Sequence, residues 1–131
     1  MKTVDFTDEE INILKNLLES KDKKLYSINK NFHTIWFQCE SSESELRIAF
    51  LSNVQLTISR VCVSPKRKGI MTSILRELIK MCKKRDIHRI VMQSVLTSEC
   101  AAFCKKNKFA PDPFASIILN EFISGDWVLN I

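Results

Sequence analysis

One segment, residues 61–75, constrains the fold of this chain more than any other. It reads Val-Cys-Val-Ser-Pro-Lys-Arg-Lys-Gly-Ile-Met-Thr-Ser-Ile-Leu. The apolar start predicts a strand, the basic middle predicts a short loop, and the apolar spacing after Gly69 predicts a helix. Gly69 is one of only two glycines in the chain, and it stands where that helix begins. The segment therefore predicts a strand–loop–helix unit whose helix starts at a glycine.

The start of this predicted helix has the properties of an anion site. A helix N-terminus presents unbonded backbone N–H groups and the positive end of the helix dipole. Three cations, Lys66, Arg67 and Lys68, precede it directly. Gly69 lets a bulky anion approach the backbone closely, because it has no side chain. We therefore expect residues 66–72 to bind an anionic group.

Length and composition predict a single domain over residues 1–131. Hydrophobic residues make up 45% of the chain and only five residues are glycine or proline, so we expect a real core and no extended disorder. No apolar run is long enough to span a membrane, and the first twenty residues contain no apolar block typical of a signal peptide. The five cysteines include no Cys-x-x-Cys pair, which favours a reduced, cytoplasmic protein without a metal site.

The positive charge is concentrated in the middle of the chain. Residues 66–89 contain nine Lys or Arg against two acids, Glu77 and Asp86, which gives this segment a charge of +7. Because the whole chain carries +5, the remainder sums to −2. Two interpretations stay open: a solvated helix face, or a functional surface for anions.

Hydrophobic periodicity and capping signals predict the other elements. Thr7-Asp8-Glu9-Glu10 is a capping box that opens a helix. An apolar stripe predicts a long helix over residues 69–85, and Thr97 or Ser98 is expected to cap a shorter one that ends near residue 107. The segment 25–40, and 34–39 above all, has strand character. Further strands are expected at 46–51, 55–63, 89–95, 114–122 and 127–131.

Turn signals predict how these strands are connected. A hairpin is expected around Ser52-Asn53, and Pro111 and Pro113 are expected to break the chain. The last two strands are predicted to form a hairpin through residues 124–126, which include Gly125. The order strand, helix, strand across residues 55–95 predicts a right-handed crossover between parallel neighbours.

Residues 66–71 resemble the acyl-CoA-binding motif of the GNAT superfamily of N-acetyltransferases. That motif runs strand, then Arg/Gln-x-x-Gly-x-Gly/Ala, then helix; here Lys66 replaces Arg or Gln and Met71 replaces the last small residue. A second block resembles the family's strand followed by Asn-x-x-Ala-x-x-x-Tyr-x-x-x-Gly-Phe. In that block the matching positions hold Thr97, Cys100, Cys104, Lys108 and Phe109.

The resemblance implies a fold, which is an α/β (α+β) domain with a mixed sheet flanked by helices. In the family this sheet is splayed where its fourth and fifth strands part. The N-terminal part of this chain is short for the family, so one early helix or strand is expected to be missing. A site reduced in this way is either open on the substrate side or completed by a partner subunit.

The resemblance also implies an activity, the transfer of an acetyl group from acetyl-CoA to a primary amine. The pyrophosphate of acetyl-CoA would bind the backbone N–H groups of residues 67–72, and those at the end of strand 61–63 would polarise the thioester carbonyl. No metal is implied. The residues carried over as acetyl-CoA-binding are Val61, Cys62, Val63, Lys66, Arg67, Lys68, Gly69, Ile70, Met71, Thr72 and Thr97.

Such a reaction needs an acid and a base, and the sequence offers one candidate for the acid. Cys104 holds the position of the family's tyrosine and is a candidate general acid for the leaving thiolate. Two alternatives stay open: Cys104 is a small core residue, or water protonates the thiolate. For the base, His33, Glu121 and Asp126 are candidates, and none is assigned.

Other functions and partners remain open alternatives. A basic module that binds nucleic acid through the +7 segment is one, and a GNAT fold that binds acyl-CoA without catalysis is another. The amine acceptor is either a small molecule or a protein, and no membrane is expected to take part. A homodimer is expected if the C-terminal hairpin leaves a strand edge exposed.

Overall fold

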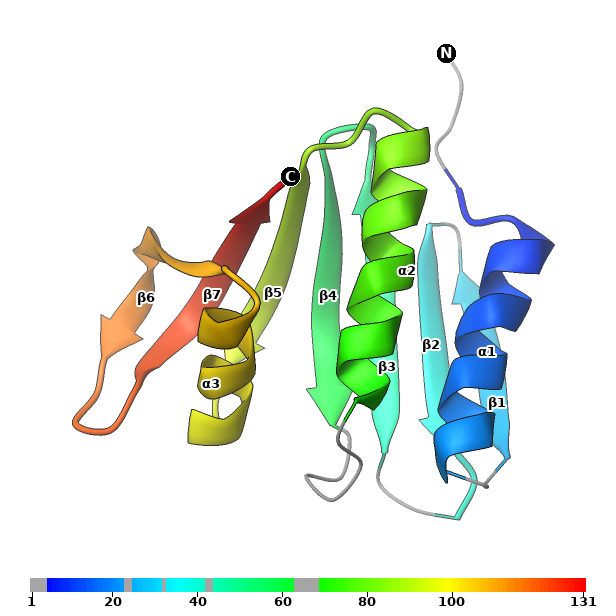
Figure 1. Cartoon of the computed structure of the whole chain (residues 1–131), viewed down its shortest axis with the longest axis horizontal. Coiled ribbons are helices and arrows are strands. Elements are labelled where there is room, and N and C mark those ends of the chain that lie inside the picture. The colour runs from blue at the N-terminus through cyan, green and yellow to red at the C-terminus, as the bar shows by residue number, and fades with distance from the viewer. Residues whose placement is uncertain (1–4, 23–24, 32, 42–43, 63–68) are drawn as a thin grey trace.

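The chain forms one mixed sheet with helices packed against it. The computed structural model describes residues 5–22, 25–31, 33–41, 44–62 and 69–131, and Figure 1 shows their arrangement. In chain order the described elements are α1 (Asp8–Asp22), β1 (Tyr26–Asn31), β2 (Thr34–Cys39), β3 (Glu45–Leu51), β4 (Gln55–Cys62), α2 (Ile70–Lys84), β5 (Arg89–Val95), α3 (Ser98–Lys106), β6 (Ala110–Ile118) and β7 (Ile123–Asn130).

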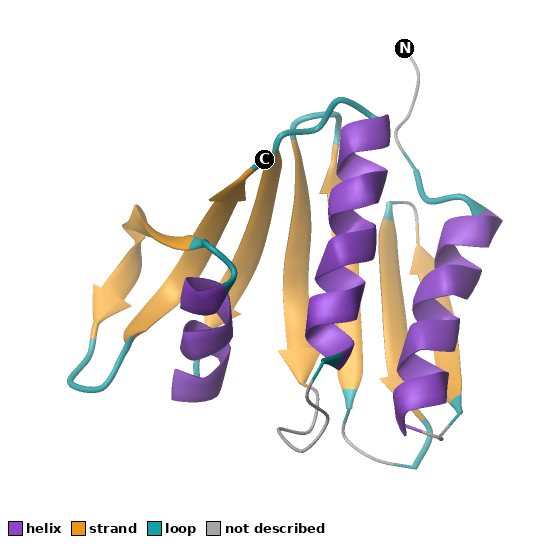
Figure 2. Ribbon diagram, viewed as in Figure 1, coloured by secondary structure: helices purple, strands orange, loops and turns teal. Residues whose placement is uncertain are grey.

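The sheet is mixed because one pair of its strands is parallel. The strand order is β1-β2-β3-β4-β5-β7-β6, in which β4 and β5 run parallel and the other neighbours run antiparallel. In Figures 1 and 2 the described helices all lie on the same face of this sheet. The predicted fold class, a mixed sheet flanked by helices, is therefore confirmed.

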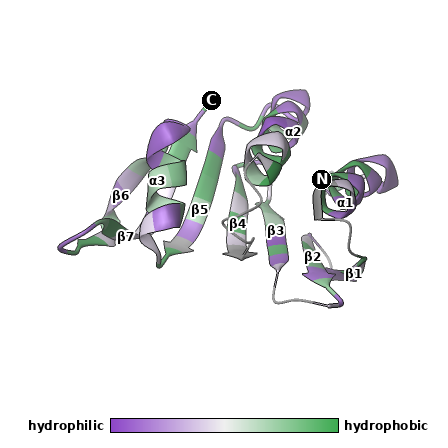
Figure 3. Ribbon diagram, turned by 60° about the horizontal axis from the view of Figure 1, so that its bottom comes forward, coloured by the Kyte–Doolittle hydropathy of each residue, from purple (hydrophilic) through white to green (hydrophobic). Residues whose placement is uncertain are grey.

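A single apolar core lies between the helices and the sheet. Leu14 and Leu18 of α1 and Leu78 of α2 are fully buried, and they join a cluster that extends through the strands to Leu129 of β7. In Figure 3 the outer faces of α1 and α2 are largely hydrophilic, as the amphipathic pattern predicts. Among the described helices, none combines the length and apolar character that crossing a bilayer requires.

The start of α1 is fixed by the predicted capping box and by an ion pair. The Thr7 N–H donates to the Glu10 carboxylate at 2.8 Å, and the Glu10 N–H donates to the Thr7 hydroxyl at 3.1 Å. Arg85, which caps the end of α2, donates to both Glu10 carboxylate oxygens at 2.7 and 2.5 Å. Both charged side chains are largely buried, with 14% of Arg85 and 8% of Glu10 exposed. This pair ties α1 to α2.

The predicted hairpin at the C-terminus is present, but its turn lies earlier in the chain than the predicted residues 124–126. The turn lies at residues 119–122, where the Leu119 N–H donates to the Phe122 carbonyl at 2.9 Å. Gly125 is not in the turn but within β7 at a φ of 102°, where a side chain would collide with the Ala115 carbonyl. This glycine therefore allows two strands to approach closely, and it does not mark a turn.

The expectation that Pro111 and Pro113 break the chain is also wrong. Both residues lie within β6, which is the last strand of the sheet. An edge strand tolerates proline because one of its sides forms no ladder hydrogen bonds. The register of β6 against β7 shifts between Pro111 and Ser116, which accommodates the prolines in an irregular stretch.

The edge strand β6 exposes a run of apolar side chains. Phe114 is 98% exposed and Ile118 is 82% exposed, and Ile117 is also exposed, as is Leu119 directly after the strand. An apolar, unpaired sheet edge is a place where a second chain can add. The homodimer stays a prediction, and β6 is the edge at which we expect it to form.

We predict that the Glu10–Arg85 pair stabilises the fold in a pH-dependent way. Burial alone would raise the pKa of Glu10, but hydrogen bonds from Arg85 and Thr7 outweigh burial and hold it below its ordinary value of 4.5. The unfolded chain therefore takes up this proton first, so the stabilisation is present above about pH 4.5 and is lost as the pH falls below it. Chemical denaturation at several pH values should show this loss in the native chain and a smaller one in Glu10→Gln.

Removing either partner at neutral pH should lower the free energy of unfolding by about 3–5 kcal/mol, because the other charge is left buried. The exposed pair Glu77–Lys80, with 3.2 Å between its charged atoms, provides the control. Lys80→Ala should cost less than about 0.5 kcal/mol. Equal effects of Arg85→Met and Lys80→Ala would contradict the role given to the buried pair.

Candidate functional site

The sheet opens between β4 and β5. These parallel strands pair only at Leu56–Ile90, Thr57–Val91 and Ile58–Met92. Beyond these pairs β4 remains paired with β3 as far as Cys62, and β5 remains paired with β7 as far as Val95. Within the described residues, β4 and β5 form no further pairs with each other. Figure 1 shows the two strands diverging toward the end at which α2 and α3 begin.

Two β-bulges account for this opening. In the β3–β4 ladder Arg47 pairs with Arg60 and Ile48 with Ile58, so Ser59 is an extra residue in β4. In the β5–β7 ladder two residues of β5, at 93 and 94, stand opposite one residue of β7. A bulge bends its strand and increases the local twist. Because both bulges follow directly after the last β4–β5 pair, each strand turns away from the other at the same level.

A side-chain contact fixes the bulge in β4. The Arg47 Nε–H donates to the Ser59 hydroxyl at 2.9 Å, and that hydroxyl donates to the Arg47 carbonyl at 3.3 Å. The Arg47 guanidinium also lies over the Trp36 ring, 5.5 Å from its centroid. The Ser59 hydroxyl thus joins the two strands where the regular ladder is interrupted, and it holds the extra residue in place.

The N-terminus of α2 lies at the open end of the sheet with its N–H groups uncapped. Gly69 precedes the helix at a φ of 97°, and its carbonyl accepts the first helical hydrogen bond from the Ser73 N–H at 3.0 Å. Among the described residues no side chain caps this end, and the first turn of α2 contains no acid. The N–H groups of residues 70–72 are therefore available to an anion.

The other helices differ from α2 in this respect. α1 has the Thr7–Glu10 capping box and three acids in its first turn. In α3, the Thr97 hydroxyl accepts a hydrogen bond from the Cys100 N–H at 3.1 Å. Thr97 was predicted to contact acetyl-CoA, and the structure shows that its side chain is used as a helix cap. Among the three described helices, α2 is the one whose N-terminus has no capping side chain among the described residues.

The structure brings some of the predicted acetyl-CoA-binding residues to this opening. Ile70 is buried in the core and Met71 packs against it, whereas Thr72 is exposed, so the first two residues offer only their backbones. Val61 and Cys62 form the end of β4 at the opening. The remaining predictions, Val63 and residues 66–68 (Lys66, Arg67 and Lys68), lie outside the described residues.

Cys104 lies in the core under α3. It is fully buried, and Cys100 lies one helical turn earlier in α3. The neighbouring Cys100 thiol and burial both raise the pKa of Cys104 well above its ordinary value, so it is protonated at neutral pH. A general acid must be protonated, but an acid that holds its proton this tightly is weak. The acid role of Cys104 stays a prediction, and its environment favours the packing alternative.

The three base candidates lie at different distances from the opening. His33 follows β1 and its carbonyl bonds to Phe50, which places it at the opposite end of the sheet from the end of β4. Glu121 is exposed in the turn between β6 and β7. Asp126 follows Gly125, which pairs with Val95 at the open end. Asp126 is therefore the candidate nearest to the opening by register, and no base is assigned.

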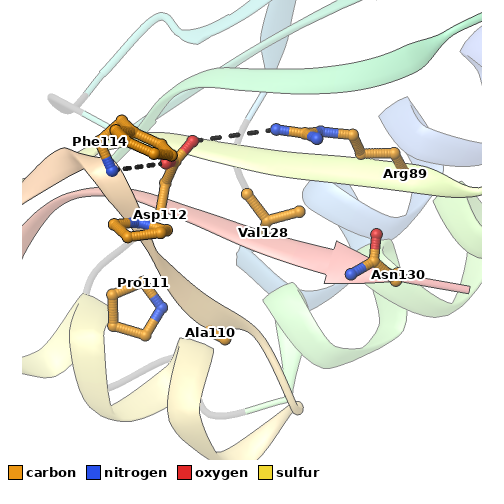
Figure 4. A pocket seen from close by; sticks show the side chains of 8 residues that line it. Arg89, Ala110, Pro111, Asp112, Phe114, Val128 and Asn130 are labelled. Carbon is orange, nitrogen blue, oxygen red and sulfur yellow. Dashed lines mark hydrogen bonds and ion pairs between the residues drawn. The ribbon is translucent and has the colours of Figure 1, made fainter.

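A shallow cleft lies elsewhere, at the closed end of the β4–β5 pair. It measures about 440 Å³ and is lined by residues of β5, β6 and β7, among them Arg89, Asp112 and Phe114 (Figure 4). The Arg89 guanidinium and the Asp112 carboxylate are 3.9 Å apart, and that carboxylate accepts the Phe114 N–H at 2.9 Å. Because Arg89 begins β5 while the opening lies at its end, this cleft is separate from the candidate site.

Within the described part of the basic segment, residues 69–89, the cations differ in burial and pairing. Of its nine cations, Arg85 is buried against Glu10 and Lys80 is paired with Glu77. Arg76, Lys83 and Lys84 are exposed on α2. The helix therefore presents fewer unpaired cations to a polyanion than its sequence suggests.

Comparison with known proteins identifies the fold. No protein-family model matches the sequence, and no curated protein matches it either. Ard1 from Thermoplasma volcanium has a similar structure, with a TM-score of 0.54 and 12% identity over 99% of this chain and 97% of that chain. An acetyltransferase from Streptococcus agalactiae gives 0.50 and 10%, covering 99% and 96%. A probable acetyltransferase of the GNAT family from Chromobacterium violaceum gives 0.52 and 14%, covering 77% and 57%.

The chain therefore has the GNAT fold, as its sequence resemblance implied. The seven-stranded order, the opening between β4 and β5 and the helix that begins beside it are all present. Sequence reasoning missed one feature of the site, the bulge at Ser59. Nothing in the sequence around Ser59 signals a bulge.

Proposed function

We propose that the protein is an N-acyltransferase that moves an acetyl group from acetyl-CoA to a primary amine. The observation that carries this proposal is the uncapped N-terminus of α2 at the opening between β4 and β5. The GNAT fold and the basic, glycine-containing motif at residues 66–71 support it independently.

Acetyl-CoA would bind with its pyrophosphate at the start of α2. The N–H groups of residues 70–72 and the positive end of the helix dipole suit such an anion. Lys66, Arg67 and Lys68 precede this helix in the sequence and would add charge. The pantetheine arm would then enter the opening between the strands, where β4 pairs with β5 no further than Ile58 within the described residues.

The opened strand edge would supply the polarising groups for the reaction. In a regular sheet the backbone groups on both edges of β4 would form hydrogen bonds with neighbouring strands. Within the described residues, β4 pairs with β5 only as far as Ile58. Backbone N–H groups of residues 59–62 on that edge could then stabilise the negative charge on the thioester oxygen as the amine attacks. The thiolate of CoA leaves and takes up a proton from water or from a nearby thiol.

Turnover on a panel of amines, followed through the release of the CoA thiol, tests the proposal. Amine-dependent release supports an acyltransferase. Binding of acetyl-CoA without release for any amine would favour the alternative of a binding protein without catalysis. Retention on nucleic acid without acetyl-CoA binding would overturn the proposal.

Gly69→Val should weaken acetyl-CoA binding more than tenfold, which corresponds to about 1.4 kcal/mol. The φ of Gly69 is 97°, which a β-branched residue adopts only under strain, so the start of α2 would rearrange. Isothermal titration calorimetry of the folded variant measures the effect.

The matched control is Gly69→Asn. A Cβ at this position meets no atom of the chain within 4 Å, and asparagine tolerates a positive φ better than other side chains do. This variant should keep more affinity than Gly69→Val. An unchanged acetyl-CoA affinity in folded Gly69→Val would show that the N-terminus of α2 is not part of the binding site.

Replacing Lys66, Arg67 and Lys68 together by alanine should raise the acetyl-CoA Kd and flatten its dependence on salt, because charge screening acts on these contacts. A matched triple variant of the exposed cations Arg76, Lys83 and Lys84 should leave both quantities unchanged. If the Kd and its salt dependence are unchanged in the first variant, as in the control, Lys66, Arg67 and Lys68 do not contact the phosphates of acetyl-CoA.

Cys104→Ala distinguishes the two interpretations of this thiol. Because the neighbouring Cys100 thiol and burial raise the pKa of Cys104, we expect kcat to fall by less than about threefold, with water protonating the thiolate. A general acid contributes typically about 10²–10⁴-fold. A loss of that size, with acetyl-CoA affinity unchanged, would establish Cys104 as the acid.

A further inference from the structure

The cleft at the start of β5 places two opposite charges among apolar walls (Figure 4). The charges are those of Arg89 in β5 and Asp112 in β6, and the walls include Pro111, Phe114 and Val128. Small-molecule sites usually combine apolar walls with a few polar groups that fix the orientation of the ligand, and their volumes are about 300–1,000 Å³. At about 440 Å³ the cleft is large enough to hold a small molecule.

The cleft lies on the face of the sheet opposite the described helices. Ile90 and Met92 of β5 belong to the apolar core beneath these helices. Because side chains alternate along a strand, Arg89 and Val91 point to the other face. Val91 is buried without belonging to that core, and its partner in β7, Val128, lines the cleft. The cleft is therefore built on a second, smaller apolar region of the molecule.

Asp112 is held in a fixed orientation. Its carboxylate accepts the Phe114 N–H at 2.9 Å, and its carbonyl accepts the Ser116 hydroxyl at 2.6 Å. The residues on both sides, Pro111 and Pro113, restrict the backbone because each ring fixes φ. The carboxylate is thus preorganised, so little conformational entropy is lost when a ligand binds to it.

Arg89 is only partly used by this carboxylate. Its guanidinium lies 3.9 Å from Asp112, which is too long for a hydrogen bond, and 44% of the Arg89 side chain is exposed. Among the described residues, the buried Nε–H of Arg89 has no hydrogen-bond partner, which is unfavourable. A small rotation of the exposed guanidinium toward a ligand carboxylate gives Nε and a terminal nitrogen a partner each, in the bidentate geometry that arginine favours.

We propose that this cleft binds a free α-amino acid with an apolar side chain. The two charges lie side by side, so Asp112 repels an anion that approaches Arg89, and Arg89 repels a cation that approaches Asp112. A zwitterion complements both, because its carboxylate faces the guanidinium while its ammonium group faces the Asp112 carboxylate. Phe114, whose ring is almost fully exposed, and Val128 provide apolar surface for the side chain of the amino acid.

This site is distinct from the opening between β4 and β5. The seven residues of β5 run from Arg89 at the cleft to Val95 at the opening, which is about 20 Å at roughly 3.3 Å per residue. An amino acid in the cleft is therefore too far from the opening to be the acceptor of an acetyl group bound there. The inference does not depend on the proposed function.

Nuclear magnetic resonance titration of the whole chain with L-phenylalanine tests the proposal. At about pH 6, where α-amino groups are protonated, we expect shifts of the backbone amide signals at residues 89–91, 110–114 and 127–130. N-acetyl-L-phenylalanine has only the carboxylate and L-phenylalanine amide has only the ammonium group. Each should bind at least about tenfold more weakly than L-phenylalanine. Glycine, which has both charges and no side chain, should also bind more weakly.

Equal binding of L-phenylalanine and its two singly charged analogues would overturn the proposal, because the charges of the cleft would then not select the ligand. Shifts confined to residues 59–62 and 69–73, at the opening, would also overturn it. So would the absence of any shift at about 10 mM L-phenylalanine, since binding would then be weaker than about 4 kcal/mol allows. These results come from the native chain and do not depend on any variant folding.

Two variants test the role of each charge. Asp112→Asn keeps an oxygen for the Phe114 N–H and removes the negative charge. It should weaken binding of L-phenylalanine and strengthen binding of N-acetyl-L-phenylalanine, because the repulsion of the ligand carboxylate is removed. Arg89→Gln should in the same way favour L-phenylalanine amide. Glu77→Gln, on α2 at the other face of the sheet, is the control and should change neither. If folded Asp112→Asn keeps the native order of affinities, the proposal is wrong.

Discussion

The candidate site depends on the short length over which β4 and β5 are paired. Three residue pairs join them, and these pairs also hold the two halves of the sheet in one structure. Directly after the last pair, a bulge in each strand bends it away from the other. The fold therefore places an unpaired strand edge in its interior, where a sheet would normally have none. An extended ligand can bind between the two strands without adding to the outer edge of the sheet.

The opening matters chemically because a helix start lies beside it. α2 spans 15 residues, and its apolar face is anchored in the core by residues such as Ile74 and Leu78. Its end is tied to α1 through the Glu10–Arg85 ion pair. The helix is thus held by packing and by its far end. Among the described residues no side chain caps its first turn, and the N–H groups that a cap would use can bind a ligand.

Much of the fold could be predicted from local patterns, because capping and periodicity are local properties. The capping box at Thr7 and the strand Arg89–Val95 both lie where the sequence predicted them. Gly125 shows where such reasoning fails, because a glycine in a turn and a glycine facing another backbone look alike in a sequence. Pro111 and Pro113 are compatible with a strand only because β6 is an edge, which depends on the whole topology.

The candidate site was predicted in part for the same reason. Gly69 could be placed at a helix start from its neighbours alone, and the structure gives it that position at a positive φ. The bulge at Ser59 depends on the register of β3 against β4, which a single sequence does not encode locally. The environment of Cys104 likewise depends on which face of α3 meets the core.

Hydrogen–deuterium exchange with and without acetyl-CoA tests the central claim most directly, because it locates the ligand on the fold. The account predicts slower exchange at residues 59–62 and 69–73, on the two sides of the opening, and no change around Arg89 and Asp112. Protection confined to that cleft, or to the exposed face of α2, would contradict an acyl-CoA site between β4 and β5.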